Sequence, residues 1–450
     1  MKRRAIFNHP FGMMRLFRTP RCADYALDSA AETAKNNAMH RRSSVVLALL
    51  LPTVACLAAE RKVTIRLDAG DFDRRDTPVS FSVESNIKGH RFLKAGDRLF
   101  PLQINETNAS FFPDPLKRGS QATFEFAVGE PQHKYASSIG ATRQNQTVQF
   151  TRTEAGRRSG DVMSKPLFTY QAEPGEFPRA NIKELFRRGA YLHPIRTLSG
   201  KVITDDFPPN HIHHHGIWWA WTNTEFDGRK PDFWNMGDGK GRVDFVTLER
   251  HWSGPVHAGF SSRHRFVDLT GPKQVEVLTE TWTVTAYAQA DSQRRWWLFD
   301  LVSEQRCATT NTLKLPENLY GGLGLRGSWA WNGATNMNFL TSEGETDRVK
   351  GNKQRGRWCD MWGLLDGEPA GIAVLCHPSN FRFPQPMRLH PTEPFFNFAP
   401  QQAGDMAIKP GETYVSRYRF IVHDGEMTKS EIDRLWNDYA QPPVVKVSVQ

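Results

Sequence analysis

The stretch V-E-V-L-T-E-T-W-T-V-T-A-Y at residues 275–287, followed by W-W-L-F-D-L-V at residues 296–302, decides the fold. The first segment alternates apolar and polar side chains over most of its length, and this period of two is typical of a half-buried β-strand. The second opens with four apolar residues in a row, which favours a strand packed between two layers. Both segments predict strands of a β-sandwich.

Further strand signals lie on both sides of this stretch, separated by turns rich in glycine and proline. They begin at Thr147 and continue to the end of the chain. Strands over roughly 300 residues predict an all-β fold, with a large antiparallel β-supersandwich at residues 147–440. The other strands expected in this region are 147–153, 166–170, 370–376 and 413–422.

A smaller group of strand signals precedes this region. Apolar residues alternate with polar ones at Val63–Leu67, Val79–Val83 and Phe124–Val128, with turn formers between them. This pattern predicts a small β-sandwich domain over residues 60–135. The polar stretch 129–146 has few large apolar residues, and we expect it to be a linker.

One short C-terminal helix is predicted. Residues Thr428–Glu431 form a capping box, in which the threonine and glutamate side chains satisfy free backbone groups at a helix start. Apolar residues follow at helical spacing, and Pro442-Pro443 ends the pattern. Those apolar residues are Ile432, Leu435, Trp436 and Tyr439.

Residues 1–59 are interpreted as a leader. From Met39, the expected start, two arginines precede the apolar run Val45–Ala55 and small residues that end at Ala59, as in a secretory signal peptide. The run is too short to span a bilayer, which takes ~20 residues. We therefore expect an exported, periplasmic or extracellular protein without a transmembrane segment, and a lipid anchor at Cys56 is the less favoured alternative.

Charge and cysteine usage exclude some classes of function. The net charge is +10, but the leader holds nine Lys and Arg against three Asp and Glu, which leaves 49 against 45 in the rest. Without a basic block, nucleic acid is not an expected partner. Cys307, Cys359 and Cys376 follow the leader, and free buried thiols are favoured over a Cys359–Cys376 disulfide.

The densest polar feature is N-H-I-H-H-H-G-I-W-W-A-W at residues 210–221. Four histidines and three tryptophans within eleven residues are hard to explain by packing alone. If the stretch were a regular strand, His211, His213 and His215 would share one face and His214 the other. Imidazoles can exchange protons near neutral pH, whereas Trp218, Trp219 and Trp234 could stack on a sugar. The alternative is that the loop and most of its tryptophans are structural.

A divalent metal at the histidine cluster is a further hypothesis, and no cofactor is required by the sequence. H-x-H supplies two ligands, whereas zinc or copper needs three or four. No spacing selects the others from the candidates, which are His193, His257, His264, His377 and His390.

Two other motifs could contribute to a site. Y-G-G-L-G-L-R at residues 320–326 lacks the context of a phosphate loop, and its glycines would let the backbone approach closely and aim Arg326. H-P-S-N-F-R at residues 377–382 follows a buried-looking strand, which places His377, Asn380 and Arg382 at a strand end. A turn alone would also explain this second motif.

Together these motifs resemble the bacterial family often labelled "methane oxygenase PmoA". The resemblance covers roughly residues 60–425 and rests also on His193-Pro194, on Asp206–Pro209 and on Asp232-Phe233-Trp234. It implies a sandwich similar to galactose-mutarotase-like folds, in which a histidine and a carboxylate often share acid and base duties. The matching residues here would be His213 or His214 as acid and Asp232, Glu280 or Asp360 as base. Many members of the family carry Arg where this chain has His215.

Three functions follow as hypotheses. The leading one is an exported enzyme, possible classes being hydrolase, lyase or epimerase, that acts on a sugar or glycoside by acid-base chemistry. The second is a non-catalytic protein that binds an oligosaccharide or other small molecule, and the third is a metal-dependent oxidoreductase. The first two predict that His193, His213, His214, Arg326 and His377 converge on one cleft walled by tryptophans.

Overall fold

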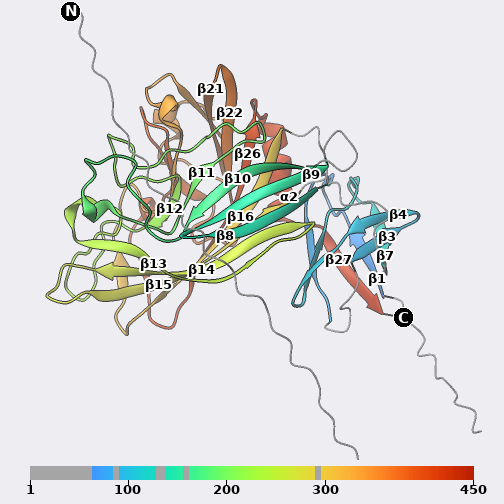
Figure 1. Ribbon diagram of the computed structural model, residues 1–450, viewed down its shortest axis with the longest axis horizontal. Coiled ribbons are helices and arrows are strands. Elements are labelled where there is room, and N and C mark those ends of the chain that lie inside the picture. The colour runs from blue at the N-terminus through green and yellow to red at the C-terminus, as the bar shows by residue number, and fades with distance from the viewer. Residues whose placement is uncertain (1–62, 85–90, 128–136, 156–161, 289–294, 450) are drawn as a thin grey trace, which may run out of the picture. The chain divides into compact units, whose positions relative to one another are not determined.

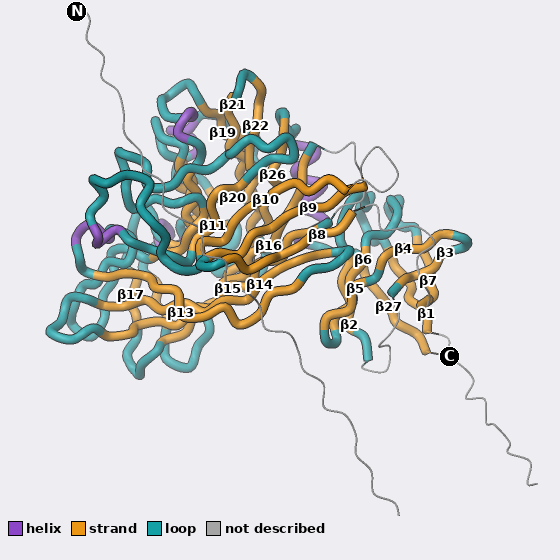
Figure 2. Tube along the Cα trace, viewed as in Figure 1, coloured by secondary structure: helices purple, strands orange, loops and turns teal. Residues whose placement is uncertain are grey.

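The computed structural model describes residues 63–84, 91–127, 137–155, 162–288 and 295–449. The leader, including Met39 and Cys56, lies outside these residues, so export stays a prediction. The described residues form one compact unit. Strands make up most of the described chain and helices are few, as Figure 2 shows. The all-β fold class is therefore confirmed.

Two large antiparallel sheets form the main body (Figure 1). The nine-stranded sheet consists, in spatial order, of β20 (Arg355–Gly356), β23 (Gln385–Leu389), β24 (Phe395–Phe398), β18 (Gly322–Arg326), β12 (Ile217–Ala220), β11 (Tyr191–Ile195), β10 (Val162–Gln171), β9 (Thr147–Ala155) and β8 (Ser137–Gln144). The eight-stranded sheet consists of β13 (Gly241–Trp252), β14 (His257–Asp268), β15 (Val275–Tyr287), β16 (Trp296–Cys307), β26 (Tyr414–Asp424), β22 (Glu368–Cys376), β21 (Trp358–Leu365) and β19 (Met337–Thr341).

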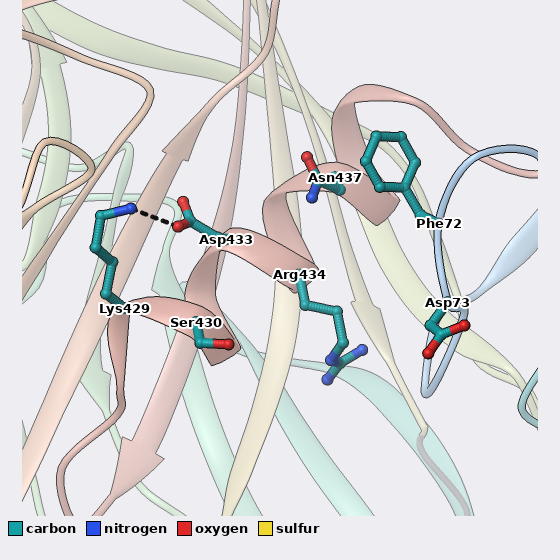
Figure 3. A pocket seen from close by; sticks show the side chains of 7 residues that line it. All are labelled: Phe72, Asp73, Lys429, Ser430, Asp433, Arg434 and Asn437. Atoms are coloured by element: carbon teal, nitrogen blue, oxygen red, sulfur yellow. Dashed lines mark hydrogen bonds and ion pairs between the residues drawn. The ribbon is translucent and has the colours of Figure 1, made fainter. Parts of the chain in front are cut away.

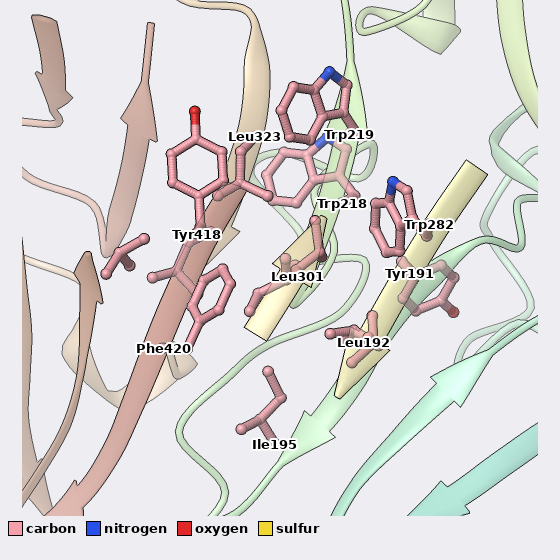
Figure 4. Packing of buried hydrophobic residues seen from close by; sticks show 14 of the residues in the cluster. Tyr191, Leu192, Ile195, Trp218, Trp219, Trp282, Leu301, Leu323, Tyr418 and Phe420 are labelled. Carbon is pink, nitrogen blue, oxygen red and sulfur yellow. The ribbon is translucent and has the colours of Figure 1, made fainter. Parts of the chain in front are cut away.

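The core lies between these sheets, because side chains from both meet there (Figure 4). Phe168 of the nine-stranded sheet packs on Phe299 of the other, with ring centroids 5.3 Å apart. Trp219 and Tyr418 meet in the same way at 6.0 Å. Burial of such aromatic surface is the main favourable term that holds the two sheets together.

The second face of the eight-stranded sheet is covered by helix α2 (Lys429–Ala440). Thr428 caps it through the expected capping box, and Trp436 donates from Nε1 to the carbonyl of Cys376 at 3.0 Å. Leu298 and Ile421 pack under the helix, whereas their neighbours Phe299 and Phe420 face the core. Two covered faces explain why β16, β22 and β26 are apolar on both sides.

The small β-sandwich contains eight strands of the described chain and has its own core. One sheet has the order β27 (Val444–Val449), β1 (Val63–Asp68), β7 (Gln121–Ala127), β3 (Phe92–Ala95) and β4 (Arg98–Pro101). The other consists of β2 (Val79–Ser82), β6 (Asn108–Phe111) and β5 (Gln103–Asn105). Strand β27 comes from the C-terminus, so the small sandwich is not built from residues 60–135 alone.

The expected linker is partly a strand. Residues 129–136 lie outside the described ranges, but β8 pairs with β9 along its whole length. Only Ile139 and Ala141 of β8 are buried, which is too few apolar residues for a clear periodic signal. Strand β8 is an edge strand of the nine-stranded sheet, and the alternation of apolar and polar residues is often weak in such strands.

The remaining elements are short. They are β17 (Leu313–Leu315), paired with β25 (Met406–Ile408), helix α1 (Arg348–Gly351) and the 3-10 turns η2 (Glu184–Phe186), η3 (Met236–Asp238), η4 (Trp329–Trp331) and η5 (Pro400–Ala403). Among the helices of the described chain, none has the length and apolar content needed to cross a membrane. Cys307, Cys359 and Cys376 are free thiols, of which the last two are buried.

Candidate functional site

The histidine cluster lies over the outer face of the nine-stranded sheet, where β12, β18 and β24 run side by side. Trp219 packs on Tyr418 of the other sheet, so its neighbour Trp218 lies on the opposite face of β12, together with Arg326 of β18. The Trp218 ring fits because Gly324 is opposite it. A Cβ on Gly324 would come within 2.7 Å of that ring.

The histidines occupy consecutive turns rather than a strand. His211 donates its backbone N–H to Pro208, and His214 donates its own to His211. Strand β12 begins only at Ile217, so the condition for the alternation, a regular strand through the histidines, is not met. His211 and His213 are half-buried, whereas His214 and His215 are buried. Pro208 and Pro209, which lack a backbone N–H, disfavour a regular strand at the start of this stretch. Gly216 is required where the stretch meets β11, because a Cβ there would lie 2.2 Å from the carbonyl of Leu192.

Arg326 holds three loops together beneath the cluster. Its side chain is 0% exposed, with Nη1 donating to Glu393 Oε2 at 2.6 Å. Nη2 donates to Asn210 Oδ1 at 3.1 Å and to Asn332 Oδ1 at 3.0 Å. A guanidinium with several fixed donors is suited to this task. The arginine expected to bind substrate therefore positions the loops that could do so.

Glu393 connects Arg326 to the surface histidines. The same Oε2 atom lies 2.9 Å from His211 Nδ1. Burial alone would raise the pKa of Glu393, but the adjacent His211 and Arg326 outweigh burial and lower it to about 2. A carboxylate that stays ionised and orients an imidazole is the arrangement that prepares a histidine for proton transfer.

His213 and His214 lie beside this pair. Their rings are 4.7 Å apart, and His213 is 5.7 Å from His211. Burial, followed by the neighbouring His211, His215 and Arg326, lowers the pKa of His213 to about 4. Burial and the same neighbours hold the pKa of His214 well below its usual value. Both imidazoles are therefore neutral at pH 7.

His215 and His193 belong to an adjoining buried layer. His215 Nδ1 lies 2.6 Å from Asp206 Oδ1, and Tyr191 donates to the other oxygen of Asp206 at 2.9 Å. His193 Nδ1 lies 3.0 Å from the hydroxyl of Thr204. Burial lowers the pKa of His193. The nearby Asp206 carboxylate opposes this shift, and His215 adds to it. His215 of this layer contacts Trp218, which in turn contacts His214 of the cluster.

Several buried polar atoms around this cluster have no hydrogen-bond partner among the described residues. An orphaned buried donor or acceptor costs ~1–3 kcal/mol, so their concentration in one place calls for an explanation. The six atoms are Asp205 Oδ2, His211 Nδ1, His214 Nδ1, His215 Nε2, Trp218 Nε1 and Arg326 Nε. Of these, His211 Nδ1 lies 2.9 Å from Glu393 Oε2 but lacks the geometry of a hydrogen bond. Burial also raises the pKa of the Asp205 carboxyl.

The tryptophans expected to stack on a ligand do not face solvent. Trp218, Trp219 and Trp234 are 0–1% exposed. Trp218 and Trp234 form an aromatic floor, with rings 4.9 Å and 6.1 Å from that of His214. Trp219 packs in the core. The stacking role expected of these three is therefore wrong in this structure, because neighbouring side chains cover their rings on both faces of the sheet.

The carboxylates expected as bases are engaged elsewhere. Asp232 accepts from the backbone of Trp234 and Asn235 and from the Thr222 hydroxyl, so it shapes a turn. Glu280 points into the core, where it binds His264 at 3.0 Å. Asp360 pairs with His423 at 3.0 Å on the α2 face of the eight-stranded sheet. Glu280 and Asp360 thus lie on elements that do not border the cluster.

The motif at residues 377–382 also lies apart from the cluster. His377 contacts Ser379 and Tyr439 of α2. Asn380 binds the backbone of Arg417, and Arg382 donates to the carbonyls of Pro400, Gly404 and Asp405. His213, His214 and Arg326 therefore lie together, with His193 in the adjoining buried layer, whereas His377 lies apart. The shared cleft expected for these residues stays a prediction.

Sequence reasoning missed Glu393 and the role of His211 and His390. His390 accepts the backbone N–H of Glu393 at 3.0 Å, and burial lowers its pKa to about 4. A usable signal existed, because H-P-T-E-P at residues 390–394 repeats the His-Pro pair of residues 193–194 and 377–378. In the described residues, no group of three or more His, Cys, Asp or Glu is arranged to hold a metal ion. The metal hypothesis gains no support from this geometry.

A shallow groove of ≈ 550 Å³ lies elsewhere, along α2 (Figure 3). Phe72 and Asp73 form one side, and helix residues including Asp433 and Arg434 form the other. Its charges are paired locally, since Lys429 binds Asp433 at 2.5 Å and Arg434 binds Asp438 at 3.3 Å. The charged helix side chains that line this groove therefore already have partners.

Comparison with known families gives one match that covers most of the large sandwich. A model described as a family of unknown function (DUF6807) matches residues 160–437. The chain belongs to this family. Its members are not described by an activity, and the "methane oxygenase PmoA" label receives no support from the match. Among curated proteins, none has a matching sequence.

Solved structures give distant likenesses only. An alpha-mannosidase from Enterococcus faecalis V583 has 9% identity and a TM-score of 0.39, and the match covers 87% of this chain and 46% of that protein. A glycosyl hydrolase family 38 protein from Enterococcus faecalis has 8% identity and a TM-score of 0.39, covering 88% and 48%. A galactose mutarotase related enzyme from Lactobacillus acidophilus has 8% identity and a TM-score of 0.23, covering 64% and 100%. This chain thus spans about half the length of the first two, and at such TM-scores none carries a functional argument.

Proposed function

We propose that the cluster around His211, His213 and Glu393 binds a carbohydrate and transfers protons to and from it. The observation that carries the proposal is the group of orphaned polar atoms around Arg326 and His214. Because these atoms are buried, a ligand with many hydroxyl groups would reach them through ordered water and would contact the half-buried His211 and His213 directly. The neutral imidazoles and the ionised Glu393 offer the matching partners at the surface.

The chain's own residues suggest how a proton would move. Because Nδ1 of His211 faces Glu393, the opposite ring nitrogen, Nε2, is the one left to accept a proton from a ligand hydroxyl. The ionised Glu393 would stabilise the imidazolium that forms, and the same nitrogen would return the proton. His213 stays neutral at pH 7 and can both donate to and accept from a neighbouring hydroxyl. Arg326 positions Glu393 and, through Asn210, the start of the histidine loop.

The test uses the purified full chain and a panel of p-nitrophenyl glycosides and linear oligosaccharides. We expect turnover of at least one compound, and His211→Ala or Glu393→Gln should lower kcat by about 10²–10⁴-fold. His251→Ala is the matched control, because His251 is an exposed histidine on β13 of the other sheet.

Other outcomes separate the remaining hypotheses. Saturable binding that is lost in His211→Ala, without turnover of any compound, would indicate a non-catalytic carbohydrate-binding protein. Stoichiometric copper, iron or zinc in the purified protein would favour the metal-dependent oxidoreductase. If the wild-type chain neither binds nor converts any member of the panel, the carbohydrate proposal fails.

A further inference from the structure

One large aromatic side chain near the cluster is exposed. Trp329 is 49% exposed, and it is the one tryptophan among the described residues with a largely exposed side chain. Its ring stacks on no aromatic or cationic side chain in the described chain. Trp331, two residues later, is buried and donates from Nε1 to the carbonyl of Leu364 at 3.2 Å. One tryptophan thus anchors η4 while the other faces solvent.

The η4 turn is tied to the cluster by the same residue that binds Arg326. Asn332 accepts from Arg326 Nη2 and donates from Nδ2 to the carbonyl of Trp329 at 2.8 Å. Gly327 and Gly333, on either side of the turn, donate to the backbone of Pro394 and Thr392 at 2.7 Å. Trp329 therefore stands on a fixed turn beside the loop that carries His390 and Glu393.

An isolated exposed aromatic residue on a surface needs no explanation. The position of Trp329 differs because its backbone is held on both sides and because Asn332 links its carbonyl to the guanidinium of Arg326. Sites for small polar ligands commonly combine an aromatic face with a few placed hydrogen-bonding groups. The buried Trp218 and Trp234 cannot supply that face, whereas Trp329 can without any movement of the core.

We propose that Trp329 is the aromatic platform of this site and stacks on the apolar C–H face of a sugar ring. The inference rests on the proposed function and narrows its ligand to a carbohydrate with a ring unit. Hydroxyls at the edge of the sugar ring would point toward His211 and Glu393. The stacking contact with Trp329 would fix the orientation of the sugar.

The experiment measures binding of the wild-type chain on a glycan array and then determines Kd for the best-bound glycan by calorimetry. We expect Trp329→Ala to raise Kd about tenfold and Trp329→Phe to raise it less, as a stacking contact predicts. Phe381→Ala is the matched control, because Phe381 is similarly exposed on the separate motif at residues 377–382. Trp329→Phe should also abolish most of the ligand-induced change in tryptophan fluorescence.

The outcomes distinguish the two proposals. If a glycan binds and His211→Ala weakens it while Trp329→Ala leaves Kd unchanged, the platform is wrong and the proposed function stands. If no glycan binds the wild-type chain, the proposed function falls and the platform falls with it. Equal losses in Phe381→Ala and Trp329→Ala would also overturn the platform, because the effect would not be local.

Discussion

Two histidine–carboxylate networks in this molecule have similar chemistry and opposite surroundings. In the core, His264 pairs with Glu280 across β14 and β15, and Glu280 accepts from Ser303 at 2.6 Å and Gln305 at 2.8 Å. On the outer face of the other sheet, His211 pairs with Glu393, which binds Arg326. The core residues are 0–1% exposed, whereas His211 and Glu393 reach the surface.

The core network shows why residue types alone do not identify a catalytic site. Ser262 Oγ lies 2.9 Å from His264 Nε2, and His264 Nδ1 lies 3.0 Å from Glu280, which is the order of a hydrolytic triad. Tyr170 occupies the same Nε2 at 2.8 Å, and no substrate could reach the group. Burial would raise the pKa of Glu280, but hydrogen bonds from His264, Ser303 and Gln305 lower it. The core groups are satisfied and sealed, and they stabilise the fold. The cluster on the other sheet instead holds buried polar atoms without a partner next to the half-buried His211 and His213.

The largest expected effect concerns the core network. Glu280→Ala should lower the free energy of unfolding by ~3–5 kcal/mol, because it leaves His264 and Gln305 buried without their partner. His211→Ala should change it by ~0.5 kcal/mol or less. Urea unfolding of both variants measures this difference. Equal losses in the two variants would contradict the division into a structural and a functional network.

The buried pair of His423 and Asp360 predicts a stability that depends on pH. Burial would lower the pKa of His423, but the adjacent Asp360 carboxylate and the Gly425 carbonyl raise it above its usual value. The stability that protonated His423 contributes to the folded protein is therefore complete below about pH 6.5, the pKa of an unfolded histidine. It is lost as the pH rises through the raised pKa of the folded state. His423→Gln should cost ~1–3 kcal/mol below pH 6.5 and less at higher pH. A loss that is the same across this pH range would show that His423 is not charged in the folded protein.

The smallest expected effect is that of His213 on stability, and its dependence on pH is opposite in sign to that of His423. The folded pKa of His213 is about 4, below the unfolded value, so the stability that it contributes is present above pH 6.5 and is lost as the pH falls toward 4. His213→Gln should remove this loss, by ~1 kcal/mol or less because the side chain is partly solvated. Unfolding free energies at pH 7 and pH 4.5 give the comparison. A variant that loses as much stability on acidification as the wild type would place the titration elsewhere.

Much of the fold could be predicted from local patterns. The alternating segments at 147–153 and 275–287 and the apolar run at 296–302 are strands, and the capping box begins the longest helix of the described chain. These features depend on neighbours within a few residues. The pairing of β27 with β1 could not be predicted, because it joins residues about 380 positions apart and β27 is mostly exposed. Strand β8 was missed because its inward side chains are few and small.

The sequence by itself determined which segments form strands and that polar groups concentrate at residues 205–215, since backbone conformation and residue type are local properties. Only the tertiary structure decided which of those groups reach solvent. Trp218 and Trp234 became the floor of the cluster, Arg326 its anchor and Glu393 its carboxylate, although Glu393 lies 182 positions from His211 in the chain. Burial and hydrogen-bond satisfaction depend on every element that packs around a side chain, and no local pattern records them.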